Sequence, residues 1–344
     1  MSRFIEALRP TVLALTVPVA LPAVAAEGDG RGRICDAVGL QAENDEVAGT
    51  DRYYTGGLRA ICVTSPRWLD ALPSPLDDAE RESRAKAAFS IGQSVFTPDD
   101  IAQVEPIDDD HPYAGWLYLG LGLESEVAPR PDRAGYLDRL ELQLGVVGPW
   151  SGAEALQRGV HDVLDATEPA GWGNQLDNEP GVNLFCSRQW TGALRVDGIG
   201  GPEGAGLALD VSPVIGAALG NVHLFGGGGL TVRVGRFEAD DHGSALIRPS
   251  LAGADGFSGR DGFSGYLFGG IEGRLVGRNI FLDGNSFQDD GPSVDKERLV
   301  GEVRVGLALG YERFGLSYTQ VFRTPEFEGQ HPHSYGSLTL TLAL

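Results

Sequence analysis

His161 is the side chain of this sequence best suited to move a proton near neutral pH, because an imidazole titrates close to that pH. Gln157 precedes it by four residues, so on a helix the two side chains lie one turn apart and reach the same volume. His161 could then take a proton from water, while Gln157 holds the imidazole or a bound water. The alternative is a histidine that is merely solvated on a helix face.

A short helix is predicted to carry this pair. Ser151 and Glu154 have the spacing of a capping box, in which each side chain accepts a hydrogen bond from a free N–H group. An apolar stripe follows at helical spacing, made of Leu156, Val160, Val163 and Leu164. Pro169 and Gly171 end the helix. Connections of this length between strands are usually functional.

Strands are predicted on either side of this helix. Leucine and valine alternate with glycine, polar or charged residues at 116–123, 139–146, 302–309 and 337–344. A soluble β-sandwich or a membrane β-barrel would both give this alternation. Strands of about 10 to 13 residues, which can cross a bilayer at a tilt, favour the barrel. The glycine- and charge-rich second face also suits a lumen.

Twelve strands are predicted, an even number as in bacterial single-chain barrels. Their ranges are 37–45, 56–65, 86–96, 114–124, 135–147, 180–193, 205–218, 221–236, 263–276, 298–310, 311–323 and 334–344. The apolar segment 280–287 is assigned to a loop. The expected fold class is therefore all-β, a twelve-stranded antiparallel transmembrane β-barrel with a short helix in an extracellular loop.

Composition is consistent with an exported protein. Residues 1–26 resemble a secretory signal peptide, with an apolar segment at 11–24 and small residues at 23–26, which leaves 27–344 as the barrel domain. A net charge of -21 argues against nucleic acid as a partner. Cys35, Cys62 and Cys186 lack the C-x-x-C spacing of zinc or redox sites, and the sequence does not choose a disulfide pair.

Three polar motifs fall in odd-numbered connections between the predicted strands. They occupy residues 43–57, 108–116 and the helix-bearing stretch 148–179. Odd connections of an up-and-down barrel share one rim, so these motifs should meet in space. With both termini in the periplasm, that rim faces outward.

The same motifs resemble the outer-membrane lipid A 3′-O-deacylase family. The resemblance lies in ENDEVAGTDRYYTGG, DDHPYAGWLYLGLG and LGVVGPWSGAEALQRGVH followed by GWGNQLDNE, and it spans most of the mature chain. It implies a twelve-stranded barrel in the outer membrane that removes the 3′-linked acyloxyacyl group of lipid A or lipopolysaccharide, using Ca²⁺. Matched by motif position, the active-site residues are Asn44, Asp45, Thr55 and His161, with Gln157 beside them.

The chemistry of these side chains suggests a role for each in ester hydrolysis, which needs an activated water and a group that stabilises the oxyanion. Asp45 is the best anionic calcium ligand, with Thr55 and loop carbonyls of 50–55 completing the shell. Asn44 and Thr55 could orient water or donate to the oxyanion, while His161 takes the proton from water. The absence of a Gly-x-Ser-x-Gly elbow favours direct attack by water. Alternatively, Asn44 and Asp45 only cap a turn.

The sequence departs from the family pattern in its basic residues. No Lys or Arg occurs between Phe96 and Pro129, so we expect lipid A phosphates to be held by Arg52, Arg59 and Arg158. We also expect an interfacial aromatic girdle formed by Tyr53, Tyr54, Tyr113 and Trp116.

Two other functions fit the same sequence. One is a barrel phospholipase, which a panel of lipid substrates would distinguish. The other is a non-catalytic barrel, such as a narrow pore or an adhesin, for which His161→Ala would change nothing. The sequence does not indicate an oligomeric state.

Overall fold

The computed structural model of the chain describes residues 34–45, 50–65, 69, 83–130, 133–199, 206–237, 241–243, 245–247, 250–253, 262–288 and 291–344. Within them Cys35–Leu344 form one compact unit. The predicted signal peptide at 1–26 lies outside the described residues. None of the helices in the described part of the chain has the length and apolar character needed to cross a membrane.

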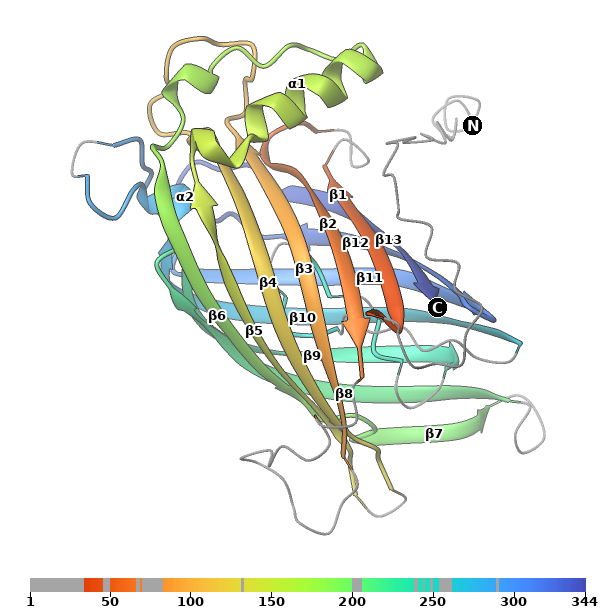
Figure 1. Cartoon of the computed structure of the whole chain (residues 1–344). Helices are drawn as coiled ribbons and strands as arrows, with labels where there is room; N and C mark the ends of the chain where they lie inside the picture. Colours follow the sequence, from red (N-terminus) through yellow and green to blue (C-terminus); the bar gives the residue numbers. More distant parts are fainter. Residues whose placement is uncertain are drawn as a thin grey trace, which may run out of the picture. The chain divides into compact units, whose positions relative to one another are not determined.

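Thirteen β-strands form one antiparallel sheet in the described part of the chain (Figure 1). They are β1 Ala37–Asn44, β2 Tyr53–Thr64, β3 Ser83–Thr97, β4 Ala114–Val127, β5 Tyr136–Val147, β6 Glu179–Gln189, β7 Leu194–Ile199, β8 Leu207–Gly220, β9 His223–Arg236, β10 Phe263–Asn279, β11 Leu299–Tyr311, β12 Phe314–Arg323 and β13 His333–Ala343. The helices are α1 Ala153–Leu164 and α2 Ile280–Asp283, with 3-10 turns η3 Pro149–Ser151 and η4 Trp172–Asn174.

The sheet closes into a ring of twelve strands, which confirms the predicted barrel. β1 pairs with both β2 and β13, and β6 pairs with both β5 and β8. The extra strand, β7, runs along β8 in the same direction as β6, so β6 and β7 are two parts of one strand. The ladder is interrupted opposite Pro213, which has no N–H to donate. The prediction ended this strand at residue 193 and missed its second part.

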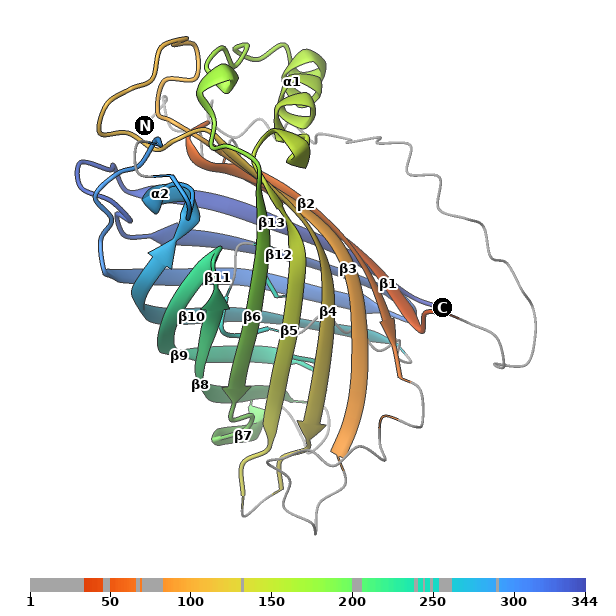
Figure 2. The ribbon, with the colours of Figure 1, turned by 60° about the vertical axis from the view of Figure 1, so that its left-hand side comes forward.

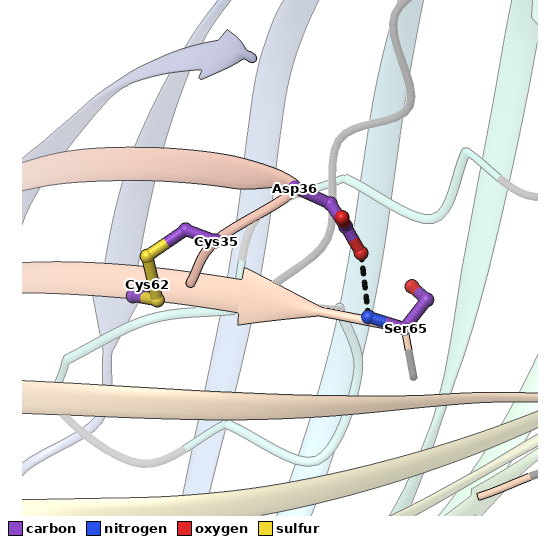
Figure 3. Close-up of a disulfide and its surroundings, with 4 residues drawn as sticks. All are labelled: Cys35, Asp36, Cys62 and Ser65. Atoms are coloured by element: carbon purple, nitrogen blue, oxygen red, sulfur yellow. Dashed lines mark hydrogen bonds between the residues drawn. A yellow bond between two sulfur atoms is a disulfide. The ribbon is translucent and has the colours of Figure 1, made fainter. Parts of the chain in front are cut away.

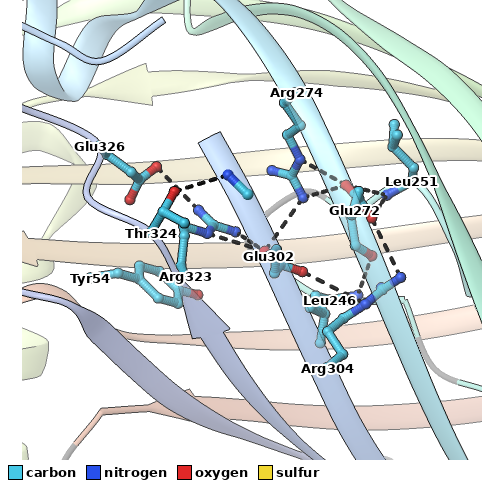
Figure 4. Close-up of polar contacts among 12 residues, drawn as sticks. Tyr54, Leu246, Leu251, Glu272, Arg274, Glu302, Arg304, Arg323, Thr324 and Glu326 are labelled. Carbon is cyan, nitrogen blue, oxygen red and sulfur yellow. Dashed lines mark hydrogen bonds and ion pairs between the residues drawn. The ribbon is translucent and has the colours of Figure 1, made fainter. Parts of the chain in front are cut away.

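Side chains alternate between the lipid face and the lumen, as expected for strands. Exposed leucine, isoleucine, valine and phenylalanine cover the outside of the sheet, including Phe89, Ile91, Leu119, Leu121, Leu140, Leu144, Ile271, Val303 and Leu340. Buried charged residues fill the lumen as ion pairs. Figure 4 shows one such group, in which Arg323 donates to Glu302 at 3.1 Å and Arg274 donates to Glu272 at 2.7 Å. These pairs satisfy charges that could not be buried alone.

Part of the β9–β10 connection turns back into the lumen. Gln41 Nε2 donates to the Ala245 carbonyl at 2.7 Å, and the Ile247 N–H donates to Glu43 at 2.8 Å. The Leu251 N–H donates to Glu272 at 3.2 Å. A cavity of about 20 Å³ remains beside this returned segment, enough for about one water. Side chains and this returned segment therefore fill the part of the lumen that the structure describes.

A second segment, which contains α2, closes the end of the lumen near α1. α2 carries Phe281 into a buried aromatic cluster with Tyr54, Phe96, Trp116 and Tyr335. The prediction was right that 280–287 is not a strand. The predicted aromatic girdle is wrong, because Tyr54 and Trp116 occupy buried lumen positions, and the buried Tyr53 and Tyr113 pack against Phe327 and Trp172.

A disulfide joins Cys35, just before β1, to Cys62 on β2 (Figure 3). The Asp36 carboxylate beside it accepts a hydrogen bond from the Ser65 N–H at 2.5 Å. Cys186, on β6, is an exposed free thiol. The sequence had left this pairing open.

Candidate functional site

α1 lies against the outer wall of the barrel, across the ends of β3 and β4 (Figures 1 and 2). Phe96 of β3 packs in the lumen, so the preceding Val95 points to the outer face. Val95 is buried there in one cluster with Ala153 of α1. Gln93, on the same face of β3, donates to the Ser151 carbonyl at 2.5 Å. The helix is therefore held on the lipid side of the sheet.

Gly115 of β4 allows this close approach. A Cβ on Gly115 would lie 2.0 Å from the Ser151 Oγ and 2.3 Å from the Ala153 Cβ. Real atoms do not come so close, so any larger residue at position 115 would push the start of α1 away from the wall. The close packing of α1 on the wall therefore requires the glycine of the motif PYAGW.

The predicted capping box is absent. α1 begins at Ala153, and its N-cap is Gly152, with a φ of 71° and no side-chain cap. Ser151 instead belongs to η3, which begins with Pro149. Glu154 accepts a hydrogen bond from Arg158 at 3.1 Å. The prediction failed because the proline-initiated turn shifts the helix start past the serine.

The polar side of α1 faces the barrel. Its buried residues are spaced by four, namely Ala153, Gln157 and His161. The pair predicted from the sequence therefore lies on the protein side of the helix, and neither side chain is simply solvated. Val163 of the predicted apolar stripe is instead exposed to the surroundings of the protein.

The ring of His161 is held by contacts at both nitrogens. Its Nδ1 lies 2.5 Å from the Thr167 carbonyl oxygen, and its Nε2 lies 3.4 Å from the Asp51 Oδ2. A carbonyl oxygen can only accept, so Nδ1 carries the proton in the neutral ring. The chain reaches this carbonyl because Asp165 ends α1 with a φ of 53° and turns the chain back. Nε2 is therefore the basic atom, and it faces the first connection.

Gln157 is oriented by a tryptophan. The buried Trp172 donates its indole N–H to the Gln157 Oε1 at 2.8 Å. This contact fixes which end of the amide is the oxygen. The Gln157 Nε2 is buried and has no hydrogen-bond partner among the described residues. An N–H donor thus remains available beside His161, one helical turn away.

Asp45 is fully buried at the end of β1. Its Oδ2 accepts hydrogen bonds from the Thr50 hydroxyl at 2.9 Å and the Arg52 N–H at 2.8 Å. Its Oδ1 is buried and has no hydrogen-bond partner among the described residues. Burial raises the pKa of Asp45 to about 9, and the nearby charge of Asp51 adds to this rise. Such an oxygen requires either a proton or a cation.

Thr55 and Asn44 lie at the paired ends of β2 and β1. Thr55 is the extra residue of a β-bulge, and its hydroxyl lies 2.7 Å from the Thr97 hydroxyl. Asn44 pairs with Gly56 across the β1–β2 ladder. A Cβ on Gly56 would lie 2.6 Å from the Glu43 carbonyl oxygen, so this close pairing of β1 and β2 requires glycine at position 56. Bulges next to functional sites commonly redirect a side chain in this way.

Asp51 is a site residue that the sequence reading missed. It lies 3.4 Å from His161, and its charge acts on Asp45. Asp51 therefore links the helix-borne pair to the first connection. Its position in TDRYYT, six residues after Asp45, was the available signal.

The predicted phosphate-binding arginines do not all fit. The prediction that Arg59 holds a phosphate is wrong. Arg59 is buried in the lumen and pairs with Glu141 at 3.4 Å, so it cannot reach a lipid outside the barrel. Arg52, just before β2, pairs with Asp99, and Arg158, on α1, pairs with Glu154. Both arginines are partly exposed, so they stay candidates for phosphate binding.

Within the described residues, His, Cys, Asp and Glu form no group of three or more that could hold a metal ion. Calcium, however, also binds hydroxyl, amide and carbonyl oxygens. The buried, unpartnered Oδ1 of Asp45 suits one bond to such an ion. The residues present therefore fit a calcium site built around one carboxylate.

The fold and the position of the site define an outer-membrane β-barrel with a polar site on its outer wall. The chain belongs to the LpxR family of outer-membrane lipid A 3′-O-deacylases, since the family described as Outer membrane protein LpxR matches residues 11–344. This confirms the resemblance seen in the sequence motifs and the location in the outer membrane.

A solved structure of the same family supports the fold, and two other outer-membrane barrels are less similar. LpxR from Salmonella typhimurium superposes with a TM-score of 0.69 at 23% identity, covering 90% of this chain and 100% of that chain. The β domain of the Bordetella autotransporter BrkA gives a TM-score of 0.42 at 9% identity, covering 90% and 99%. The KdgM porin gives 0.36 at 6% identity, also covering 90% and 99%. No curated protein sequence matches the chain.

Proposed function

We propose that this protein removes the 3′-linked acyloxyacyl group of lipid A by attack of a water that His161 activates, with Ca²⁺ bound beside it. The observation that carries the proposal is the outward position of the site. His161 and Gln157 lie between α1 and the outer wall, next to the lipid face of β3 and β4. An ester in the same membrane can approach from the side.

The proposed orientation places α1 on the outer surface of the cell. The connections that carry Asp45, Tyr113 and His161 all lie at one rim (Figure 1). With the start of β1 and the end of β13 at the opposite rim, toward the periplasm, this rim would face the outer leaflet, where lipid A is found. His161 would then lie at the level of the acyl esters.

The proposed proton transfers use His161 and the two groups that contact its ring. His161 Nε2 takes a proton from water as the water oxygen bonds to the ester carbonyl carbon. The Thr167 carbonyl holds the Nδ1 proton, and Asp51 stabilises the imidazolium that forms. The imidazolium then returns the proton to the 3′ oxygen as the C–O bond breaks. The products are a free acyloxyacyl acid and a 3′ hydroxyl.

Gln157 and Thr55 would support these transfers. The free N–H of Gln157 can donate to the water or to the developing oxyanion. We propose Asp45 and Thr55 as protein ligands of calcium, because the Asp45 Oδ1 lacks a partner and the Thr55 hydroxyl keeps a lone pair free. The ion, when bound, would polarise the ester carbonyl and stabilise negative charge on its oxygen. Asn44 would orient the water from the end of β1.

The filled lumen argues against the pore alternative. Ion pairs such as Arg59–Glu141 and the returned segment around Ile247 occupy the described interior. The site lies outside the ring of strands instead.

Mass spectrometry of lipids incubated with the purified protein tests the proposal. The panel contains hexa-acylated lipid A, phosphatidylethanolamine and phosphatidylglycerol, each with calcium or with a chelator. We expect loss of one acyloxyacyl unit from lipid A, with calcium only, and intact glycerophospholipids. Cleavage of the glycerophospholipids alone would overturn the proposal in favour of a phospholipase.

A further inference from the structure

α1 has a charged flank and an apolar flank on either side of its barrel-facing residues. Successive residues of a helix are rotated by about 100°, so residues four apart share a side. The charged flank consists of residues spaced by four, namely Glu154, Arg158 and Asp162. Val160 and Val163 lie on the opposite flank. Val163 is 83% exposed, so nothing in the described protein covers it.

The turn before α1 adds a large apolar group. Trp150 in η3 is 76% exposed, although its neighbour Ser151 is buried against the wall. The Trp150 N–H donates to the Asn178 Oδ1 at 2.7 Å, which fixes the backbone while the ring stays free. Exposed tryptophans of membrane proteins concentrate at the membrane–water interface.

This apolar flank is close to the lipid-facing belt of the barrel. Gln93 binds the Ser151 carbonyl, and the next outward residue of β3 is Ile91, about 7 Å further along the strand. Ile91 is 51% exposed, and its cross-strand partner Leu119 is 64% exposed. The helix therefore starts where the established lipid surface ends.

We propose that η3 and α1 form an interfacial anchor in which the exposed Trp150 and Val163 lie among the acyl chains, with the charged flank of α1 in water. The occupant of the flank is the lipid surface, because the flank continues the barrel's own lipid face. One exposed valine and one exposed tryptophan offer too little area for a stable contact between two copies, which needs about 800 Å² from each partner. The anchor requires only that the barrel spans a membrane; the leaflet follows from the orientation proposed above.

The anchor would also fix the depth of the site. Gln157 and His161 lie on the same two turns of α1 as Val160 and Val163. A helix held at the base of the head groups would keep the His161 ring at a constant level relative to the esters of neighbouring lipids. This consequence rests on the proposed function, whereas the anchor itself does not.

Spin labels on the two flanks test the anchor. In a Cys186→Ala background, which removes the exposed thiol and keeps the Cys35–Cys62 disulfide, a nitroxide is attached at V163C, at W150C or at D162C. Each protein is reconstituted in vesicles of phosphatidylethanolamine and phosphatidylglycerol. Power-saturation spectra then give the accessibility of each label to oxygen and to a water-soluble nickel chelate. Heat-modifiable electrophoretic mobility confirms that each barrel is folded.

We expect labels at positions 163 and 150 to be at least about threefold less accessible to the nickel chelate than the label at 162, because a polar reagent partitions poorly into acyl chains. Equal nickel accessibility at 162 and 163 would overturn the anchor and place α1 above the membrane. Dipolar broadening at 163 that grows with protein density would also overturn it, in favour of a contact between copies. The labels report depth whether or not lipid A is hydrolysed, so failure of the anchor and failure of the proposed function are separable.

Discussion

At the scale of single residues, the site is defined by polar atoms that can still bind water, substrate or an ion. His161 presents Nε2 to Asp51, Gln157 retains a free N–H, and Asp45 retains a free oxygen. Buried polar atoms without partners are rare in folded proteins. Their occurrence on Gln157 and Asp45, two residues of the same family motifs, points to a bound water, substrate or ion.

Removing the charge of Asp51 should slow the reaction. In Asp51→Asn we expect a decrease in kcat of about tenfold, because the imidazolium of His161 loses the carboxylate 3.4 Å away. The rate is measured as release of the acyloxyacyl acid from lipid A. Asp162→Asn changes an exposed residue on the charged flank of α1 and is the control, which should leave the rate unchanged.

The double variant separates a role through His161 from a structural one. If Asp51 acts through the imidazole, Asp51→Asn should add almost no loss to His161→Ala, since residues that act as a unit are not additive. A further tenfold loss in the double variant would contradict this role.

Calcium affinity should rise with pH. Burial raises the pKa of Asp45 to about 9 without a cation, so at neutral pH its carboxyl group holds a proton that calcium must displace. Affinity should therefore increase by up to about tenfold per pH unit, and level off near the pKa of Asp45. Calorimetric titration at several pH values, in two buffers, measures both the affinity and the protons released.

Asp45→Asn is the matched variant for this titration. It cannot be ionised, so binding should weaken and lose its pH dependence. A wild-type affinity that stays constant between about pH 6 and pH 8 would show that Asp45 is not a ligand.

At the scale of elements, two strands are held in place from inside the barrel. Glu43 precedes Asn44, and Tyr54 precedes Thr55, with both side chains directed into the lumen. The Tyr54 hydroxyl donates to Glu43 at 2.7 Å, and the Ile247 N–H donates to the same carboxylate at 2.8 Å. This contact fixes the ends of β1 and β2 that carry the outer site.

Breaking that contact should disturb the site without opening the barrel. We expect Glu43→Ala to lower both kcat and calcium affinity by about tenfold, since two buried hydrogen bonds to a charged group are lost. Glu43→Gln retains an acceptor and should lose less. Activity and calorimetry measure these effects, and electrophoretic mobility checks the fold. Unchanged calcium affinity in a folded Glu43→Ala barrel would contradict the role.

The helix shows what periodicity can and cannot predict. The spacing of Gln157 and His161 correctly placed them on one face of a helix, because 3.6 residues per turn is a local property. The predicted start of the helix was wrong, because Ser151 belongs to the turn that begins at Pro149. Which face of α1 is buried depends on the part of the barrel against which the helix packs. No local sequence pattern indicates that part of the barrel.

At the scale of the whole molecule, the barrel was predictable because strand alternation and an even strand count are strong signals. The second half of the interrupted strand, β7, was missed because its break depends on Pro213 in a different strand. The aromatic girdle was wrong because the lumen of this barrel buries Tyr54 and Trp116. The returned segment that fills the lumen follows a long connection, whose path is set by distant partners such as Glu43 and Glu272.

The chain as a whole places the proposed hydrolytic site between a sheet and the surrounding lipid. Its strands face lipid outward, its lumen is filled, and the polar face of α1 is pressed to the outer wall. The arrangement suits a substrate that stays in the membrane during the reaction.

Mass spectrometry of lipid A from cells that produce the wild type or His161→Ala tests this account most directly. We expect wild-type cells to lose one acyloxyacyl unit from lipid A, and His161→Ala to reduce that conversion at least about 10²-fold at equal levels of folded barrel. His331→Ala, at an exposed position, is the control and should behave as the wild type. Full conversion of lipid A by folded His161→Ala would contradict the account.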